Sequence, residues 1–242
     1  MTAVEATSKS IPREERLIVA LDLPDAEQAK AFVELVGDHA GFYKIGLELF
    51  VAGGYFELLE WLIRHRKKVF VDLKFFDVPE TVRAAVRGLR NRGVSFATVH
   101  GNQAMLEAAG KEKGEVKILA VTVLTSLDRG DLDDLGFQCD VEKLVLSRAR
   151  RALEAGCDGV ISSGIEAPAL KREIGNRLIV VTPGIRPVEN RPADDQKRTV
   201  DVAQAFANGA DYIVVGRPIR QAHDPRAAAA AIQGTIASIF RS

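Results

Sequence analysis

Cysteine is scarce in this sequence, and neither sign of charge is in excess. The chain holds only 2 cysteines among 242 residues, Cys139 and Cys157. They are too few for a disulfide framework and lie outside any metal-ligand spacing, so we expect a reducing, cytoplasmic setting. The 33 basic and 33 acidic residues cancel, which indicates no general attraction to nucleic acid or to an anionic membrane. Any anionic ligand must therefore be bound by local groups.

Long apolar runs are also missing. No segment reaches membrane-spanning length, and residues 1–15 lack the apolar core of a signal peptide. We expect these residues to form a loose N-terminal tail and residues 16–242 to form one domain. A content of 47% hydrophobic and 27% charged residues is typical of a globular domain with a sizeable core.

Short apolar segments alternate with amphipathic helical patterns along the chain. This alternation predicts an α/β fold, a single-domain (β/α)8 TIM barrel. A doubly wound open sheet is the alternative, but no G-x-G-x-x-G motif follows the first strand. The expected strands cover residues 17–22, 41–46, about 69–74, 95–100, 117–124, 159–162, 178–182 and 211–216. Helices are expected at about 24–36, 50–65, 79–89, 102–113, 141–153, 167–174, 199–208 and from 225 onward, with loops at 126–140 and 183–198.

The stretch VFVDLKFFDVPET, residues 69–81, is the most informative part of the sequence. Because side chains alternate across a strand, Phe70, Asp72 and Lys74 share one face. Buried charges are costly unless they are paired, so two of them at the end of an apolar strand indicate a functional site. The alternative is a self-neutralising pair that closes one end of the barrel, with Asp77 serving the turn before the next helix.

Other charges fall at the ends of neighbouring strands, where barrel active sites form. Asp22 ends the first strand and Lys44 lies late in the second. Together with Asp72 and Lys74 they predict a pocket mouth lined by alternating acids and lysines, which can act as a fixed electrostatic device and a proton source. His100 ends the fourth strand, and either a pocket role or a core role fits that position.

The segments TPGIR and VGR, which end at Arg186 and Arg217, follow the seventh and eighth strands. These are the usual phosphate-binding loops of a barrel, and guanidinium groups beside glycine N–H groups suit phosphate oxygens. The segments therefore predict a phosphorylated small molecule as ligand. The length of the 183–198 loop is typical of a lid.

Seven segments together resemble the bacterial-type orotidine 5′-monophosphate decarboxylase family. They read LDLPD, YKIG, VDLKFFDVPETV, VLTS, TPGIRP, DDQKR and VVGRPI, in this order, between about residues 17 and 225. The D-x-K-x-x-D core is shared with related sugar-phosphate barrels, but its combination with the glutamine loop and the GRPI segment is much more specific. The resemblance implies decarboxylation of orotidine 5′-monophosphate to uridine 5′-monophosphate with no metal and no cofactor, Lys74 protonating C6 of the pyrimidine.

The resemblance also implies roles for individual residues. Asp77 and Thr81 would enter the site of the neighbouring subunit in a homodimer, and Glu80 stands where many relatives carry asparagine. The implied catalytic residues are Lys74, Asp72, Asp77 and Lys44. The implied substrate-binding residues are Asp22 and Lys44 for the ribose, Thr81, Thr125 and Ser126 with the pyrimidine near Thr125, and Arg186, Gln196, Gly216 and Arg217 for the phosphate and lid.

Two rival functions remain open at this stage. A metal-dependent enzyme acting on a sugar phosphate would need an extra acid near Asp72 to hold magnesium, and Glu48 is available by residue type. A non-catalytic protein that binds nucleotide phosphates would bind uridine monophosphate without turnover.

Overall fold

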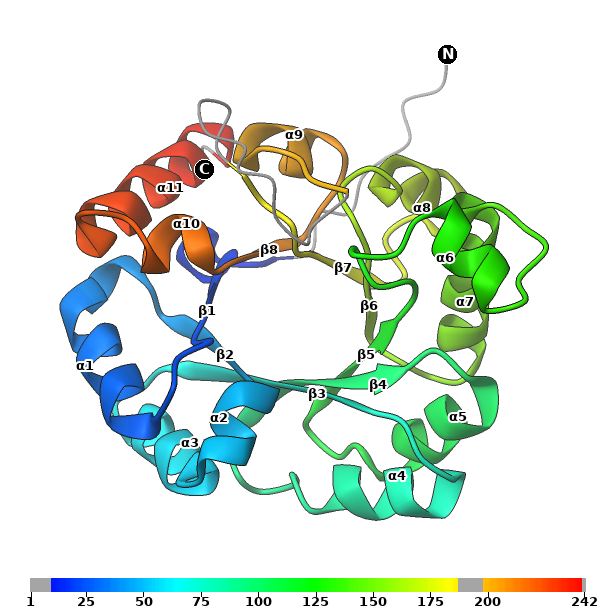
Figure 1. Cartoon of the computed structure of the whole chain (residues 1–242), viewed down its shortest axis with the longest axis horizontal. Coiled ribbons are helices and arrows are strands. Elements are labelled where there is room, and N and C mark those ends of the chain that lie inside the picture. Colours follow the sequence, from blue (N-terminus) through cyan, green and yellow to red (C-terminus); the bar gives the residue numbers. More distant parts are fainter. Residues whose placement is uncertain (1–9, 187–197, 241–242) are drawn as a thin grey trace.

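The computed structural model describes residues 10–186 and 198–240. Within them, β1 to β8 form a closed barrel in which every strand pairs in parallel with the next and β8 pairs with β1. Helices surround this ring (Figure 1). The predicted (β/α)8 barrel is therefore confirmed. The strands are β1 (Leu17–Ala20), β2 (Phe42–Gly46), β3 (Lys68–Phe75), β4 (Val94–His100), β5 (Lys117–Val121), β6 (Gly159–Ile161), β7 (Ile179–Thr182) and β8 (Tyr212–Val215).

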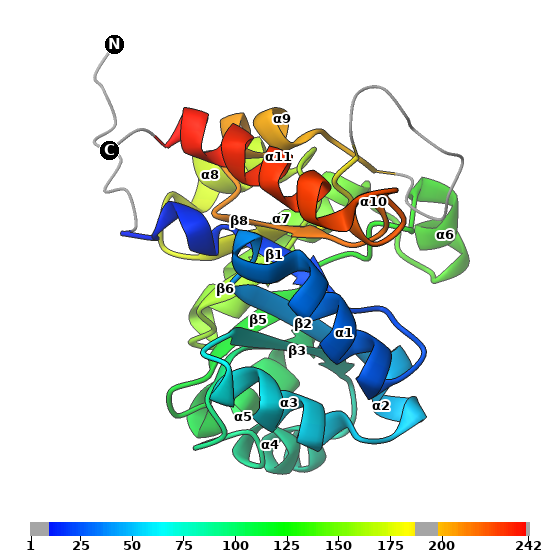
Figure 2. The same cartoon turned by 90° about the vertical axis from the view of Figure 1, so that its left-hand side faces the viewer.

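The helices follow the predicted order with some changes of boundary. The short α2, α6 and α10 lie toward the same end of the barrel (Figure 2). None of the helices in the described parts of the chain is long and apolar enough to cross a membrane. The helices are η1 (Arg13–Glu15), α1 (Ala26–Val36), η2 (Gly37–His39), α2 (Leu47–Ala52), α3 (Tyr55–Arg64), α4 (Pro79–Arg87), α5 (Gln103–Glu112), α6 (Arg129–Asp134), α7 (Val141–Glu154), α8 (Ala167–Ile174), α9 (Val202–Ala207), α10 (Arg217–Arg220) and α11 (Pro225–Ile239).

Several expected segments differ from the structure: the strand expected over 117–124 ends at Val121, and the short helix α10 was not expected. The helix expected over 50–65 is two helices, because Gly53 and Gly54 take positive φ values of 88° and 70° between them. The loop expected over 126–140 contains α6, which Asp128 begins with a capping box. The helix expected over 199–208 starts only at Val202, because Val200 forms a β-bridge with Ile185 and Asp201 caps the helix.

The end of the expected N-terminal tail packs against the barrel. η1 contacts α11, and Glu15 pairs with Lys68 at the start of β3, with 2.5 Å between Oε2 and Nζ. Gln233 Nε2 donates to the carbonyl of Glu14. The division of the chain at residue 15 stays a prediction, since residues 1–9 lie outside the described part.

Alternation along the strands gives the barrel two apolar layers. One layer lies inside the ring and includes Phe42, Phe70 and Phe96, while residues such as Tyr43 and Val71 pack toward the helices. Lys44 lies two residues beyond Phe42, and Asp72 lies two beyond Phe70. The same alternation that fills the barrel therefore turns these charges inward at the carboxyl end of the strands.

Candidate active site

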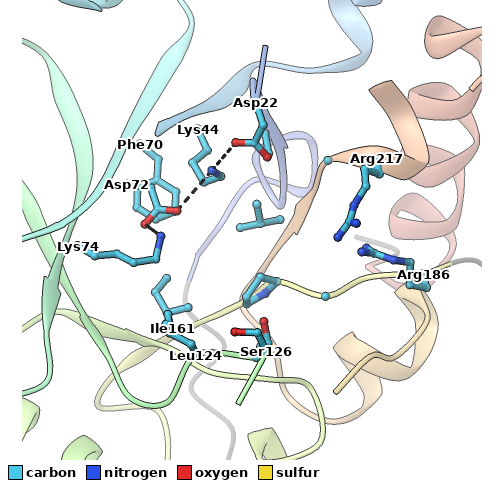
Figure 3. Close-up of a pocket in the computed structure, with 16 residues that line it drawn as sticks. Asp22, Lys44, Phe70, Asp72, Lys74, Leu124, Ser126, Ile161, Arg186 and Arg217 are labelled. Carbon is cyan, nitrogen blue, oxygen red and sulfur yellow. Dashed lines mark hydrogen bonds and ion pairs between the residues drawn. The ribbon is translucent and has the colours of Figure 1, made fainter. Parts of the chain in front are cut away.

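A cavity of about 240 Å³ opens at the carboxyl end of the barrel. Figure 3 shows Asp22, Lys44, Asp72 and Lys74 on one side of it, and Arg186 and Arg217, which follow β7 and β8, on the other. Apolar side chains, among them Phe70, Leu124 and Ile161, fill the rest of the wall. The predicted residues that line the cavity are Asp22, Lys44, Asp72, Lys74, Thr125, Ser126, Arg186, Gly216 and Arg217.

The four charges form one connected chain. Lys44 Nζ lies 2.9 Å from Asp22 Oδ1 and 3.4 Å from Asp72 Oδ2. Lys74 Nζ lies 3.0 Å from Asp72 Oδ1. Each lysine therefore contacts a carboxylate, and Asp72 is shared by both lysines.

Burial and pairing act in opposite directions on these groups. Burial raises the pKa of Asp72, but the charges of Lys44 and Lys74 and the hydrogen bonds from Lys74 and Thr98 outweigh it and hold that pKa below its ordinary value. Burial likewise lowers the pKa of Lys44, and the carboxylates of Asp72 and Asp22 reverse this effect, so that its pKa lies above the ordinary value. Asp72 stays ionised and Lys44 protonated at neutral pH.

The backbone of Lys74 departs from extended geometry. Its φ is +48°, a left-handed value that is uncommon for a residue with a side chain. The ladder between β3 and β4 shifts register between Val71 and Phe75, so Lys74 lies inside an irregular part of the strand. Its N–H donates to the side-chain oxygen of Thr98 at 2.9 Å. Residue type alone does not predict this conformation, because glycine is the usual residue at such φ values.

The opposite wall combines arginines with glycine backbone. Arg186 is buried, with an exposed fraction of 7%, and its Nη1 donates to the carbonyl of Ile185. Gly184 has φ +76°, and a Cβ added at Gly216 would lie 3.4 Å from that of Ala20. The backbone on this wall can therefore approach a ligand closely, which suits a phosphate group.

Arg198 connects two of the loops around the pocket, and no sequence pattern singled it out as a site residue. Its Nη1 pairs with Glu166, and its Nη2 donates to the carbonyls of Val123 and Leu124. Those carbonyls precede Thr125 in the chain. A buried arginine with this set of partners fixes the loop that carries Thr125.

Asp77 and Thr81 do not line the cavity of their own chain. Both are exposed, and Asp77 Oδ1 accepts a 2.6 Å hydrogen bond from the N–H of Val78. Glu80, where the resemblance implies asparagine in many relatives, pairs with Arg83. Gln196 lies outside the described residues, as does most of the predicted lid, of which only residues 183–186 and 198 are described.

His100 lies beside the pocket rather than in it. Its ring packs against Phe76, with centroids 4.5 Å apart, and it is absent from the cavity wall. Burial and the nearby charge of Arg148 lower its pKa. Burial also raises the pKa of the Cys157 thiol to about 12, which makes that cysteine a poor nucleophile.

The described residues hold no group of three or more His, Cys, Asp or Glu side chains that could bind a metal ion. Glu48, the extra acid that a magnesium site would use, is exposed on α2 and does not line the cavity. Among the described residues, the charged and hydroxyl side chains that line the cavity are those of two lysines, two arginines, two aspartates, Thr125 and Ser126.

Comparison with known proteins found relatives that match most of the chain. A protein of Methylococcus capsulatus described as orotidine 5′-phosphate decarboxylase is 67% identical over 234 residues, which cover 97% of each chain. One of Stenotrophomonas maltophilia with the same description is 53% identical over 93% of this chain and 94% of its own. The crystal structure of orotidine 5′-phosphate decarboxylase from Lactobacillus acidophilus superposes with a TM-score of 0.81 at 35% identity, covering 92% of this chain and 99% of that one.

The model of one protein family matches residues 15–232, a range that contains the whole barrel and every residue of the cavity wall. That match and the two relatives identify the family of this chain, which belongs to the orotidine 5′-phosphate decarboxylase / HUMPS family.

Proposed function

We propose that this protein converts orotidine 5′-monophosphate to uridine 5′-monophosphate, the last step of pyrimidine nucleotide synthesis, without a metal ion or an organic cofactor. The observation that carries the proposal is the chain of Asp22, Lys44, Asp72 and Lys74, which faces two arginines across one cavity. Relatives named for this decarboxylation match nearly the full length of the chain, which supports the same substrate.

The proposed reaction breaks the bond between C6 of the pyrimidine and its carboxylate. Carbon dioxide leaves, the electron pair stays at C6, and Nζ of Lys74 gives a proton to that carbon. Asp72 stands against the departing carboxylate and holds the ammonium of Lys74 at 3.0 Å. This contact would orient the proton donor before the substrate arrives, and the positive charge of Lys74 would stabilise the carbanion-like centre.

The remaining wall residues would bind the parts of the substrate that do not react. Arg186, Arg217 and the N–H of Gly216 are suited to the phosphate. Thr125 and Ser126, which line the cavity, would contact the pyrimidine, and Asp22 with Lys44 would hold the ribose hydroxyls. Gln196 remains a predicted phosphate and lid residue. Binding energy from the phosphate would then help to assemble the site around the reacting carbon.

We also infer a homodimer in which Asp77 and Thr81 complete the partner's site. Asp77 is flanked by Phe76 and Val78, which expose 59% and 62% of their surface. The helix after the neighbouring strand, α2, exposes Leu47, Phe50 and Val51. Exposed apolar side chains of this kind mark interaction surfaces, and a two-fold axis would bring the same loops together from both chains. The cytoplasmic setting stays a prediction.

The decisive experiment is to add the purified protein to orotidine monophosphate and follow the absorbance of the pyrimidine, with and without EDTA. We expect turnover at the same rate in both cases, because protein side chains supply the proton and the charge. Loss of turnover with EDTA and recovery with magnesium would favour the metal-dependent rival. Binding of uridine monophosphate without turnover would favour the non-catalytic rival.

A further inference from the structure

Thr98 lies fully buried in β4, with an exposed fraction of 0%, and faces the charged chain. Its Oγ1 lies 2.9 Å from the backbone N of Lys74 and 2.9 Å from Asp72 Oδ1. A threonine hydroxyl has one hydrogen to donate and lone pairs to accept with. The N–H of Lys74 must donate to Oγ1, so the hydroxyl hydrogen is directed at the carboxylate of Asp72. One hydroxyl thus contacts both residues assigned to the reacting carbon.

The register between β3 and β4 explains why a side-chain oxygen, rather than a backbone carbonyl, accepts from the N–H of Lys74. Val71 pairs with Ala97 and Phe75 pairs with Val99, so residues 72–74 of β3 lie opposite Thr98 alone. The excess residues of β3 bulge, and Lys74 takes its φ of +48° within this bulge. The Thr98 hydroxyl supplies the acceptor for the Lys74 N–H there, and so holds the backbone in a conformation that a lysine rarely adopts.

The hydroxyl also restricts the carboxylate. Asp72 Oδ1 accepts from Thr98 at 2.9 Å and from Lys74 Nζ at 3.0 Å. Its other oxygen, Oδ2, then faces Lys44 at 3.4 Å. Without the hydroxyl, the two lysines would be the remaining polar partners of the carboxylate, and their long side chains are themselves flexible.

We propose that Thr98 is a positioning residue for the decarboxylation, and that its hydroxyl fixes the Asp72 carboxylate and the Lys74 backbone relative to each other. The inference rests on the proposed function, and it assigns Thr98 no contact with the substrate. A small loss of alignment at a proton donor lowers the rate of the chemical step more than it lowers affinity.

The test compares Thr98→Val, which keeps the shape and removes the hydroxyl, with Thr98→Ser, which keeps the hydroxyl. We expect Thr98→Val to lower kcat about 10- to 100-fold, the effect of losing a hydrogen bond to a charged group, with KM changed less than about threefold. Thr98→Ser should stay within about threefold of the wild-type kcat. The affinity for uridine monophosphate should be similar in all three proteins.

Thr122→Val is the matched control. Thr122 is also 0% exposed, and its hydroxyl donates to the backbone carbonyl of Ile161 at 2.7 Å rather than to one of the four charged side chains. We expect this variant to lose thermal stability comparably to Thr98→Val but to keep kcat within about twofold. A purely structural role of Thr98 would make the two variants alike in kcat.

The pH profile gives a second readout. Loss of the hydrogen bond from Thr98 raises the pKa of Asp72, so the acidic limb of kcat/KM should move to higher pH in Thr98→Val and stay in place in Thr122→Val. A folded Thr98→Val with wild-type kcat, or a Thr98→Ser as impaired as Thr98→Val, overturns the proposal. If Thr98→Val does not fold, Thr98→Ala is used in its place. A lowered kcat in that variant supports the proposal, and a wild-type kcat overturns it.

The outcome for the wild type separates this inference from the proposed function. If wild-type protein does not turn over orotidine monophosphate, the proposed function fails and the role of Thr98 fails with it. If the wild type turns over and Thr98→Val does so equally well, only the role of Thr98 fails.

Discussion

The two walls of the pocket hold their charges in different ways. On the side of β1 to β3, two aspartates and two lysines contact one another at 2.9 to 3.4 Å, and their formal charges sum to zero. On the side of β7 and β8, Arg186 and Arg217 place two positive charges beside glycine backbone (Figure 3). The first wall is neutral as a set, while the second presents two guanidinium groups to the cavity.

This difference suggests that one wall determines affinity for the substrate and the other acts in the chemical step. A neutral set of charges attracts an anion weakly from a distance, but it creates a strong local field where its members are fixed in a site of low polarity. Affinity for a phosphorylated substrate must therefore come mainly from the arginine wall. The aspartate and lysine wall can act on charge that develops at the reacting carbon. Substitutions on the two walls should change different kinetic constants.

The largest effect is expected for Lys74→Ala, which removes the proposed proton donor and leaves Asp72 with one lysine fewer. A proton donor contributes about 10²–10⁴-fold to the rate, and loss of the positive charge adds to this effect. Lys68→Ala is the control, because Lys68 begins the same strand at the opposite end of the barrel and pairs with Glu15. Steady-state assays should show kcat collapsing only in Lys74→Ala. A folded Lys74→Ala with near-normal kcat would remove the proposed role of Lys74.

The next effect tests whether the aspartate and lysine wall is completed by a second chain. Lys74→Ala and Asp77→Ala should each be inactive, and mixing them under conditions of subunit exchange should restore activity. In a mixed dimer, one pocket takes its lysine from the Asp77→Ala chain and its aspartate from the other chain. With random pairing, recovery approaches roughly a quarter of the wild-type value.

Subunit exchange must be shown independently, for example by mixing differently labelled chains. If exchange takes place and the mixture stays inactive, Asp77 acts within its own chain. The charged wall would then be complete in one subunit, and the exposed Phe76 and Val78 would need another explanation.

The barrel and the main charges of the site were predictable from sequence because both depend on short periodicities. Strand alternation with period two placed Lys44 and Asp72 inside, and the closed barrel confirms the order of the strands. The break in the helix at Gly53 was visible as two glycines, but the apolar pattern that continues to Leu62 concealed it. Periodicity describes regular elements and says little about where they stop.

The contacts of Thr98 and Arg198 could not be predicted from sequence periodicity. The left-handed φ of Lys74 arises from a register shift between two strands, and such a shift depends on both partners rather than on local sequence. Arg198 reaches Glu166 in the loop after β6 and the carbonyls of Val123 and Leu124 in the loop after β5. Threonine in an apolar strand is also an ordinary β-forming residue, so nothing in the sequence distinguished Thr98 from a packing residue.

A smaller effect is expected on the arginine wall. Arg217→Ala should lower kcat/KM for orotidine monophosphate about 10- to 100-fold, mainly through KM, because a charged hydrogen bond to phosphate is lost. Orotidine, which lacks the phosphate, should be affected little by the same change. Arg226→Ala on α11 is a control, since this arginine donates to the carbonyl of Leu35, a contact outside the pocket. Equal losses for both substrates would mean that Arg217 does not meet the phosphate.

The smallest effect concerns His100, at the edge of the charged wall. Its pKa lies below the ordinary value because burial disfavours the imidazolium and Arg148 repels it. The unfolded chain therefore takes up this proton at higher pH than the folded chain does. The contribution of neutral His100 to the free energy of unfolding is fully present above about pH 6.5, the pKa of the unfolded chain. It is lost as the pH falls through that value toward the pKa of the folded chain.

His100→Gln should remove this dependence. Since the histidine is partly exposed, we expect the difference in unfolding free energy between the variant and the wild type to change by less than about 1 kcal/mol between about pH 7.5 and 5.5. Denaturant titrations at both pH values would measure it. Because the ring packs on Phe76 and stays out of the cavity wall, kcat at neutral pH should remain within about threefold of the wild-type value. A larger fall in kcat in a folded His100→Gln variant would mean that His100 contributes to the active site.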